Sequence, residues 1–112
     1  MYIGEISKKT GLSIKAIRFY EEKGLIEQPK RKGRYRVYDE KDIELLLLIK
    51  EAKSLGITLT KLKGVINHHN GQLDWREIKI FLSEVRKQLI SKIDDINKQV
   101  NRLDKCYSQI NA

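Results

Sequence analysis

The strongest constraint on this chain is a stripe of apolar residues at helical spacing that fills its last third. The residues recur at intervals of four and three, with one stutter around Leu89, and this pattern is typical of a coiled coil. The stripe consists of Ile78, Leu82, Val85, Leu89, Ile93, Ile96, Val100, Leu103, Tyr107 and Ile110. From Trp75 onward the sequence therefore predicts one helix on the order of 50 Å long.

Such a stripe needs a partner, because no other segment of the chain is long enough to cover it. A second copy of the same helix is the simplest partner, since soluble assemblies favour closed two-fold pairs. The alternative for its first two turns is a fold-back, in which Trp75, Ile78 and Phe81 pack on the preceding helix. We expect the dimer contact to be formed by Leu89, Ile93, Ile96, Val100, Leu103 and Tyr107.

A polar segment at 67–74 separates this stripe from the rest of the chain. With 112 residues, the chain has room for one small domain and an appendage. We expect a head at 1–70 and a dimerisation helix at 71–112, with no separate effector domain.

The charge balance points to a polyanionic partner. The chain has 23 Lys and Arg residues against 15 Asp and Glu residues, a formal net charge of +8. Residues 30–36 hold five cations in seven positions and no acid. This favours nucleic acid as the partner and an anionic membrane surface as the second choice.

Several classes of protein have little support. No run of eighteen apolar residues could span a membrane, and the N-terminus lacks the apolar core of a secretion signal. A single cysteine, Cys106, cannot form a disulfide within one chain. There is no Ser/His/Asp set, no glycine-rich phosphate loop and no carboxylate cluster. We expect a cytoplasmic protein that is not an enzyme and has no cofactor.

The first 24 residues have the pattern of a helix, a short turn with Gly11, and a second helix that Ser13 can cap. In the second helix, Ile14 and Ile17 are three residues apart and can face a core. Lys15, Arg18 and Phe19 then face outward, as expected of a recognition helix in a major groove. The alternative is two helices of an ordinary small bundle.

The next segment predicts a hairpin and two more helices. Residues 25–27 can pair with 35–38 as strands, which leaves the basic segment 28–34 as the tip of a DNA-binding wing or, alternatively, as a solvated loop. Asp39 is expected to cap a central helix that runs to Leu55, and Thr58 to cap a fourth helix.

Together these segments strongly resemble the head of the MerR family of bacterial transcription regulators. The resemblance covers residues 2–66 and is carried by Ile3-Gly4-Glu5-Ile6, Gly11-Leu12-Ser13, residues 16–25 (Ala-Ile-Arg-Phe-Tyr-Glu-Glu-Lys-Gly-Leu), Tyr35-Arg36-Val37-Tyr38, Asp42-Ile43 and Leu55-Gly56-Ile57-Thr58-Leu59.

The resemblance implies a mainly α fold: a winged helix-turn-helix head followed by a long helix that forms an antiparallel coiled coil in a homodimer. Such a dimer sits on a pseudo-palindromic operator in double-stranded promoter DNA. On receiving a signal it distorts the promoter, and so acts indirectly on RNA polymerase. The residues implied as DNA contacts are Ser13, Lys15, Arg18, Phe19, Tyr20, Arg31, Arg34, Tyr35 and Arg36.

The sequence does not identify a signal. Metal-sensing relatives use several cysteines, whereas Cys106 alone cannot fill even a two-coordinate site, so we expect no bound metal. The adjacent His68 and His69 are expected to be solvated. Cys106 as a thiol sensor is an alternative to a structural role. Two other functions stay open: an architectural or recombination-directing DNA-binding protein with the same head, and a coiled-coil interaction module.

Overall fold

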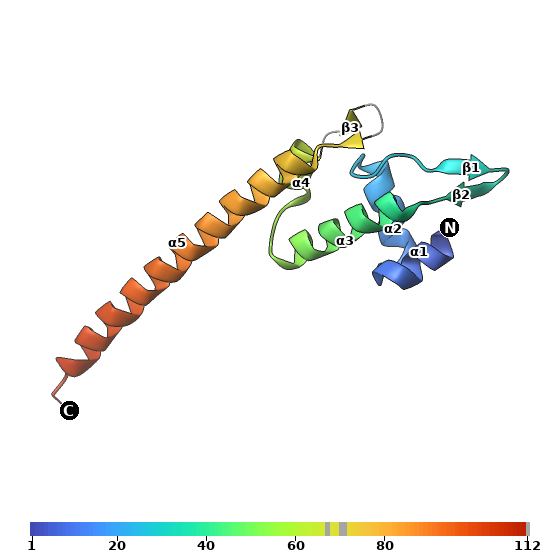
Figure 1. Cartoon of the computed structure of the whole chain (residues 1–112). Coiled ribbons are helices and arrows are strands. Elements are labelled where there is room, and N and C mark those ends of the chain that lie inside the picture. Colours follow the sequence, from blue (N-terminus) through green and yellow to red (C-terminus); the bar gives the residue numbers. More distant parts are fainter. Residues whose placement is uncertain (67, 70–71, 112) are drawn as a thin grey trace. The chain divides into compact units, whose positions relative to one another are not determined.

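The computed structural model of the protein describes residues 1–66, 68–69 and 72–111 (Figure 1). In chain order its elements are α1 (Ile3–Thr10), α2 (Ile14–Glu22), β1 (Lys30–Lys32), β2 (Tyr35–Val37), α3 (Glu40–Ser54), α4 (Leu59–Val65), β3 (His68–His69), β4 (Gln72–Leu73) and α5 (Trp75–Ser108). The chain divides into two compact units, of which the first ends at Asp74 and the second begins at Trp75. The boundary that the sequence predicted between residues 70 and 71 lies outside the described residues.

The helix-turn-helix prediction is confirmed by the caps that define it. Gly11 ends α1 in the left-handed region at φ 74°, and its N–H donates to the Ser7 carbonyl. The Ser13 hydroxyl oxygen accepts a 3.0 Å hydrogen bond from the N–H of Ala16, which caps α2. The turn between the two helices is thus fixed by local hydrogen bonds.

The caps of α3 and α4 also match the prediction. Asp39 and Asp42 form a reciprocal capping box, in which each carboxylate accepts from the other residue's backbone N–H at 3.1 and 3.0 Å. Burial, the largest cause, raises the pKa of Asp42 above its usual value. The Thr58 hydroxyl oxygen accepts from the N–H of Lys61 at 3.2 Å.

The core of the head lies between α1, α2 and α3. Its fully buried side chains are Ile6, Ile17, Leu25, Ile26, Leu46 and Ile49. The helix α3, expected as the central helix, is not covered on every side, because Leu47 is 43% exposed. Lys50 connects α3 to the turn, since its ammonium donates a 3.0 Å hydrogen bond to the carbonyl of Thr10 at the end of α1.

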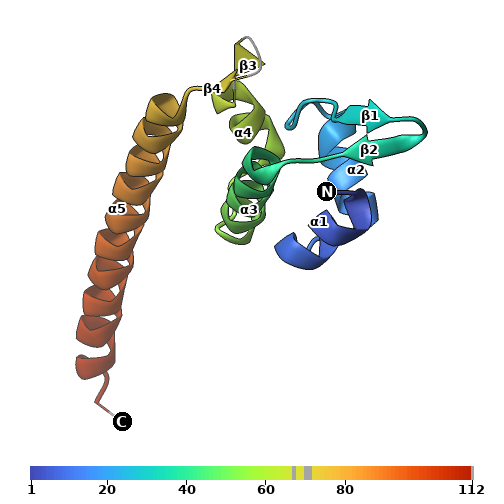
Figure 2. The same cartoon turned by 45° about the vertical axis from the view of Figure 1, so that its right-hand side comes forward.

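The first strand of the hairpin does not lie where the sequence predicted. Leu25 and Ile26 were expected to form it, but both side chains are buried in the core. The chain turns there at Gly24, with φ 78°, and the N–H of Leu25 donates to the carbonyl of Tyr20 at 3.0 Å. The strand is formed instead by the basic residues of β1, which pair antiparallel with β2. The hairpin extends beyond the helices of the head (Figure 2).

A second antiparallel pair of two-residue strands, β3 and β4, lies in the segment that the sequence identified only as a polar break. After it, α5 is a single helix of 34 residues, as predicted from the apolar stripe. Among the described residues of α5, Ile78 alone is buried. No helix in the part of the chain that the structure describes has the length and apolar character needed to cross a membrane.

Candidate nucleic-acid interface

The outer face of α2 carries the cations that the sequence placed there. Lys15 and Arg18 are exposed, and Phe19, one turn after Lys15, is 39% exposed. The ammonium of Lys23, one turn later, lies 5.5 Å from the centroid of the Phe19 ring, within range of a cation–π contact. The exposed face of α2 thus combines cations with an apolar ring.

Tyr20 was predicted to share this outer face, and that assignment is wrong. Its side chain is only 4% exposed, because it follows Ile17 by three residues and so lies on the same inner face of α2. The ring meets Phe19 edge-on at 5.9 Å, and the ammonium of Lys53 lies 5.8 Å from its centroid. Tyr20 therefore packs on the inner face of α2 and cannot contact a DNA groove.

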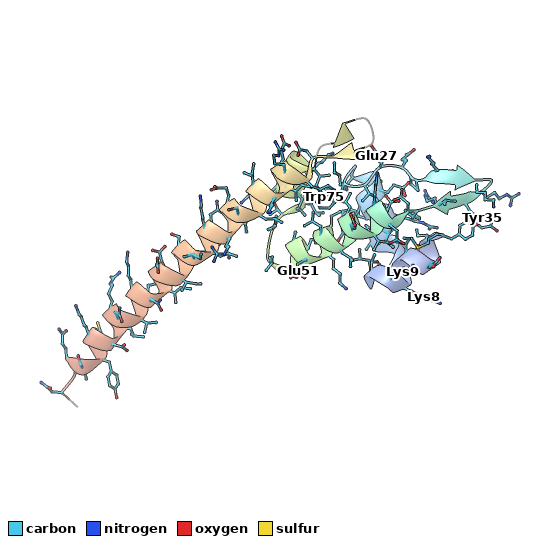
Figure 3. All side chains as sticks on the ribbon, in the orientation of Figure 1. Lys8, Lys9, Glu27, Tyr35, Glu51 and Trp75 are labelled. Atoms are coloured by element: carbon cyan, nitrogen blue, oxygen red, sulfur yellow. The ribbon has the colours of Figure 1, made fainter. Side chains whose placement is uncertain are left out.

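The hairpin presents a concentrated positive charge. Lys30, Arg31 and Lys32 on β1 are all exposed, and so is Arg34 in the two-residue loop Gly33–Arg34 that joins β1 to β2. Gly33 has φ 63°, the left-handed conformation that such tight loops require. Tyr35 is exposed on β2 (Figure 3), and its ring centroid is 5.5 Å from that of Tyr2.

Arg36 differs from the other cations of the hairpin because it is engaged inside the head. Its Nε lies 3.3 Å from Oε1 and 3.2 Å from Oε2 of Glu21 on α2. The Tyr38 hydroxyl donates a 3.4 Å hydrogen bond to the same carboxylate. Burial and the negative charge of Glu21 raise the pKa of Tyr38 to about 12.

Sequence reasoning missed three residues of this surface. Glu21 follows Ile17 by four residues, so helical spacing alone could have placed it on the inner face of α2. Lys23 joins the aromatic face through Phe19 and also lines a cavity of about 230 Å³ with Leu59 and Lys63. No pattern in the sequence could have paired Tyr2 with Tyr35, which lies 33 positions away.

The residues predicted to form a dimer contact all lie exposed on α5. Their exposed fractions range from 39% for Leu89 to 80% for Tyr107. The helical spacing puts Leu89, Ile93, Ile96, Val100, Leu103 and Tyr107 on one side of the helix. Ile110, just beyond the helix, is also exposed.

Cys106 is exposed beside this stripe, with Arg102 and Lys105 lining the same shallow hollow on α5. Within the described residues, no three His, Cys, Asp or Glu side chains gather where they could hold a metal ion. The described geometry therefore concentrates on two features: a cationic surface on the head and an apolar stripe on α5.

Comparison with known proteins identifies the family to which the chain belongs. Residues 1–69 match the model of the MerR HTH family of regulatory proteins. The chain is 34% identical over 113 residues to the HTH-type transcriptional regulator CueR of Salmonella typhi, which covers 100% of this chain and 78% of that relative. It is also 34% identical over 108 residues to an uncharacterized HTH-type transcriptional regulator of Synechocystis sp., covering 95% of this chain and 79% of the relative.

A solved structure agrees with these matches. The crystal structure of a putative MerR family transcriptional regulator from Listeria monocytogenes has a TM-score of 0.70 and 25% sequence identity, over 96% of this chain and 83% of that one. The chain belongs to the MerR family of helix-turn-helix transcriptional regulators, which confirms the resemblance seen in the sequence.

Proposed function

We propose that this regulator binds promoter DNA as a homodimer, with α2 in the major groove and the β1–β2 hairpin against the phosphate backbone. The observation that carries the proposal is the exposed cationic and aromatic face of α2 next to a hairpin with four exposed cations. Such a regulator acts on the chromosome, so we place it in the cytoplasm.

The exposed face of α2 suits base recognition. An arginine can donate two parallel hydrogen bonds to O6 and N7 of guanine, the commonest specific contact in the major groove. Arg18 is our candidate for this contact, flanked by Lys15 and by the apolar ring of Phe19. Ser13 is committed to capping α2 through its hydroxyl, so its contribution is to fix the N-terminus of the helix that enters the groove.

The hairpin suits phosphate contacts. Arg31 and Arg34 are exposed, and phosphate contacts by such cations release counterions and give affinity without reading sequence. Tyr35 can add a hydrogen bond to a phosphate from its exposed hydroxyl. These contacts would hold the head in register while α2 reads the bases.

The apolar stripe of α5 suits a second copy of the same helix. Burying one Val, Leu or Ile side chain contributes about 1.5–3 kcal/mol, so a paired stripe offers a substantial driving force for association. We propose an antiparallel pair, because that arrangement places one head at each end of the coiled coil. Two heads at a fixed separation match an operator made of two inverted half-sites.

A dimer with this geometry can act on transcription mechanically. Bending a site of 20–30 base pairs costs roughly 1–6 kcal/mol, which the phosphate contacts of two heads can offset. We propose that a signal switches the dimer to a state that distorts the promoter, and that RNA polymerase responds to the realigned DNA and not to a direct contact.

The test compares Arg18→Ala with Lys98→Ala, which removes one cation from the side of α5 opposite the stripe. Fluorescence anisotropy is measured on a duplex from upstream of the gene and on a shuffled duplex of the same composition. A base contact predicts a loss of about 1–3 kcal/mol for Arg18→Ala on the upstream duplex only. An Arg18→Ala variant that binds the upstream duplex as tightly as Lys98→Ala would overturn the proposed role of α2.

A further inference from the structure

We propose that Glu21 is a positioning residue, whose carboxylate fixes the β1–β2 hairpin at a set angle to α2. The proposal rests on the DNA-binding function proposed above. In this proposal Glu21 and Arg36 do not contact DNA themselves. They set the position of the hairpin's phosphate contacts relative to the base contacts of α2.

The geometry of the link is well defined. Glu21 extends from the inner side of α2, and its side chain is only 7% exposed. Both carboxylate oxygens are engaged, since Oε1 lies 3.3 Å from Nε of Arg36 and Oε2 accepts the hydroxyl of Tyr38 at 3.4 Å. One carboxylate therefore joins α2 to β2 and to the residue that follows β2.

The hairpin requires such a counter-charge. The register pairs Arg31 directly with Arg36, and like charges opposite one another destabilise an antiparallel pair. The other exposed cations of the hairpin add to this repulsion. The carboxylate of Glu21 neutralises Arg36 from the side of α2, so that Arg31 alone of the pair presents its charge outward.

Backbone hydrogen bonds hold the base of the hairpin. They do not by themselves fix the angle between the hairpin and α2. The N–H of Tyr38 donates to the carbonyl of Met1 at 2.6 Å, and the Met1 nitrogen donates to the carbonyl of Tyr38 at 2.8 Å. Further along β2 the ring of Tyr35 contacts that of Tyr2, but a ring contact is not directional, so a hairpin held in this way can still swing about its base. The ion pair from Glu21 to Arg36 lies further along β2, where it can oppose this swing.

The consequence concerns specificity more than affinity. If the hairpin is fixed, Arg31 and Arg34 meet phosphates only when α2 is seated in the groove at one depth. If the hairpin is loose, the same cations can contact the DNA phosphates whichever base sequence lies against α2. Glu21→Gln should therefore lower the ratio of specific to non-specific affinity, while the loss of one negative charge favours binding to any duplex.

The test measures the affinity of the full chain for the upstream duplex and for the shuffled duplex, together with its thermal unfolding. The variants are Glu21→Gln, Arg36→Lys, Arg36→Gln, the double variant Glu21→Gln/Arg36→Gln, and Glu44→Gln as a control for the loss of an exposed carboxylate from a helix of the head. Arg36→Lys keeps the charge but loses the planar fork, so it probes the geometry if Glu21→Gln fails to fold.

We expect Glu21→Gln to reduce the specificity ratio about tenfold, within the range of coupling between contacting residues. Arg36→Lys should reduce it in the same direction, and Arg36→Gln should cost less in the Glu21→Gln background than alone. A specificity ratio for Glu21→Gln equal to that of Glu44→Gln would overturn the proposal. So would an equal loss of affinity of Glu21→Gln for both duplexes that is in proportion to its loss of thermal stability. Absence of duplex binding by the unmutated chain would instead overturn the proposed function, and this inference with it.

Discussion

The buried phenol of Tyr38 predicts a specific loss of stability at alkaline pH. Its side chain is 2% exposed, and its hydroxyl donates to the carboxylate of Glu21. Deprotonation would create a buried phenolate beside that carboxylate. Burial is the largest cause of the raised pKa, the charge of Glu21 adds to it, and Arg36 opposes it.

The sign and size of the effect follow from linkage. The folded-state pKa is about 12, against about 10 in the unfolded chain. The contribution of Tyr38 to stability is therefore fully present below pH 10 and is lost as the pH rises towards 12. Two pKa units correspond to about 2.7 kcal/mol in total, and about 1.4 kcal/mol of this is already lost at pH 11.

The assay is urea unfolding followed by circular dichroism at pH 9 and at pH 11, at one fixed protein concentration. Lysines and the other tyrosines also titrate in this range, so the comparison is with Tyr38→Phe, which retains them all. The free energy of unfolding of the unmutated chain should fall between the two pH values by about 1.4 kcal/mol more than that of the variant. Equal decreases in both proteins would refute the assignment of a raised pKa to Tyr38.

Two further predictions test the core and the stripe. Ile17→Ala should lower the free energy of unfolding by about 2–5 kcal/mol, because Ile17 is fully buried. Ile14→Ala should cost much less, because Ile14 is 38% exposed. Similar losses for the two variants in urea unfolding would contradict this assignment of the inner face of α2. Leu103→Lys should convert the proposed dimer to a monomer in sedimentation experiments. It should also weaken binding to the upstream duplex while leaving the stability of the head nearly unchanged. A dimer of this variant that persists at micromolar concentration would contradict the proposed contact.

The parts of the fold that the sequence predicted are those that local interactions determine. Gly11, Ser13, Asp39 and Thr58 start or end helices through hydrogen bonds that span only a few residues, so each signal is complete within its own segment. The stripe after Trp75 is likewise a property of one helix. These elements could be located without knowledge of the rest of the chain.

The hairpin shows where such reasoning fails. Leu25 and Ile26 have the β-branched or apolar side chains that suit a strand, but the core of the head competes for them and buries both. The basic segment 30–32 has weak strand propensity, and its strand depends on the register that the two-residue loop at Gly33 imposes. A prediction that counted back from this loop would have paired Lys32 with Tyr35 correctly.

Which side chains of α2 form the proposed interface depends on which residue anchors the helix in the core. The fully buried Ile17 is the anchor whose spacing places Tyr20 and Glu21 inside, whereas the family resemblance, and not this spacing, had assigned Tyr20 to the DNA-contacting face. A carboxylate within a charged sequence is normally expected at the surface, so the buried position of Glu21 depends on Arg36 and Tyr38 arriving from a distant strand.

The same nine-residue helix therefore connects the two halves of the proposed DNA-binding surface. In the proposed complex its outer side offers Lys15, Arg18 and Phe19 to the groove, and its inner side holds the hairpin through Glu21. Because both sides belong to one rigid element, a change that rotates α2 within the core moves the base contacts and the phosphate contacts together. Substitutions at Ile17 should consequently alter DNA recognition even in variants that remain folded, although Ile17 itself is fully buried.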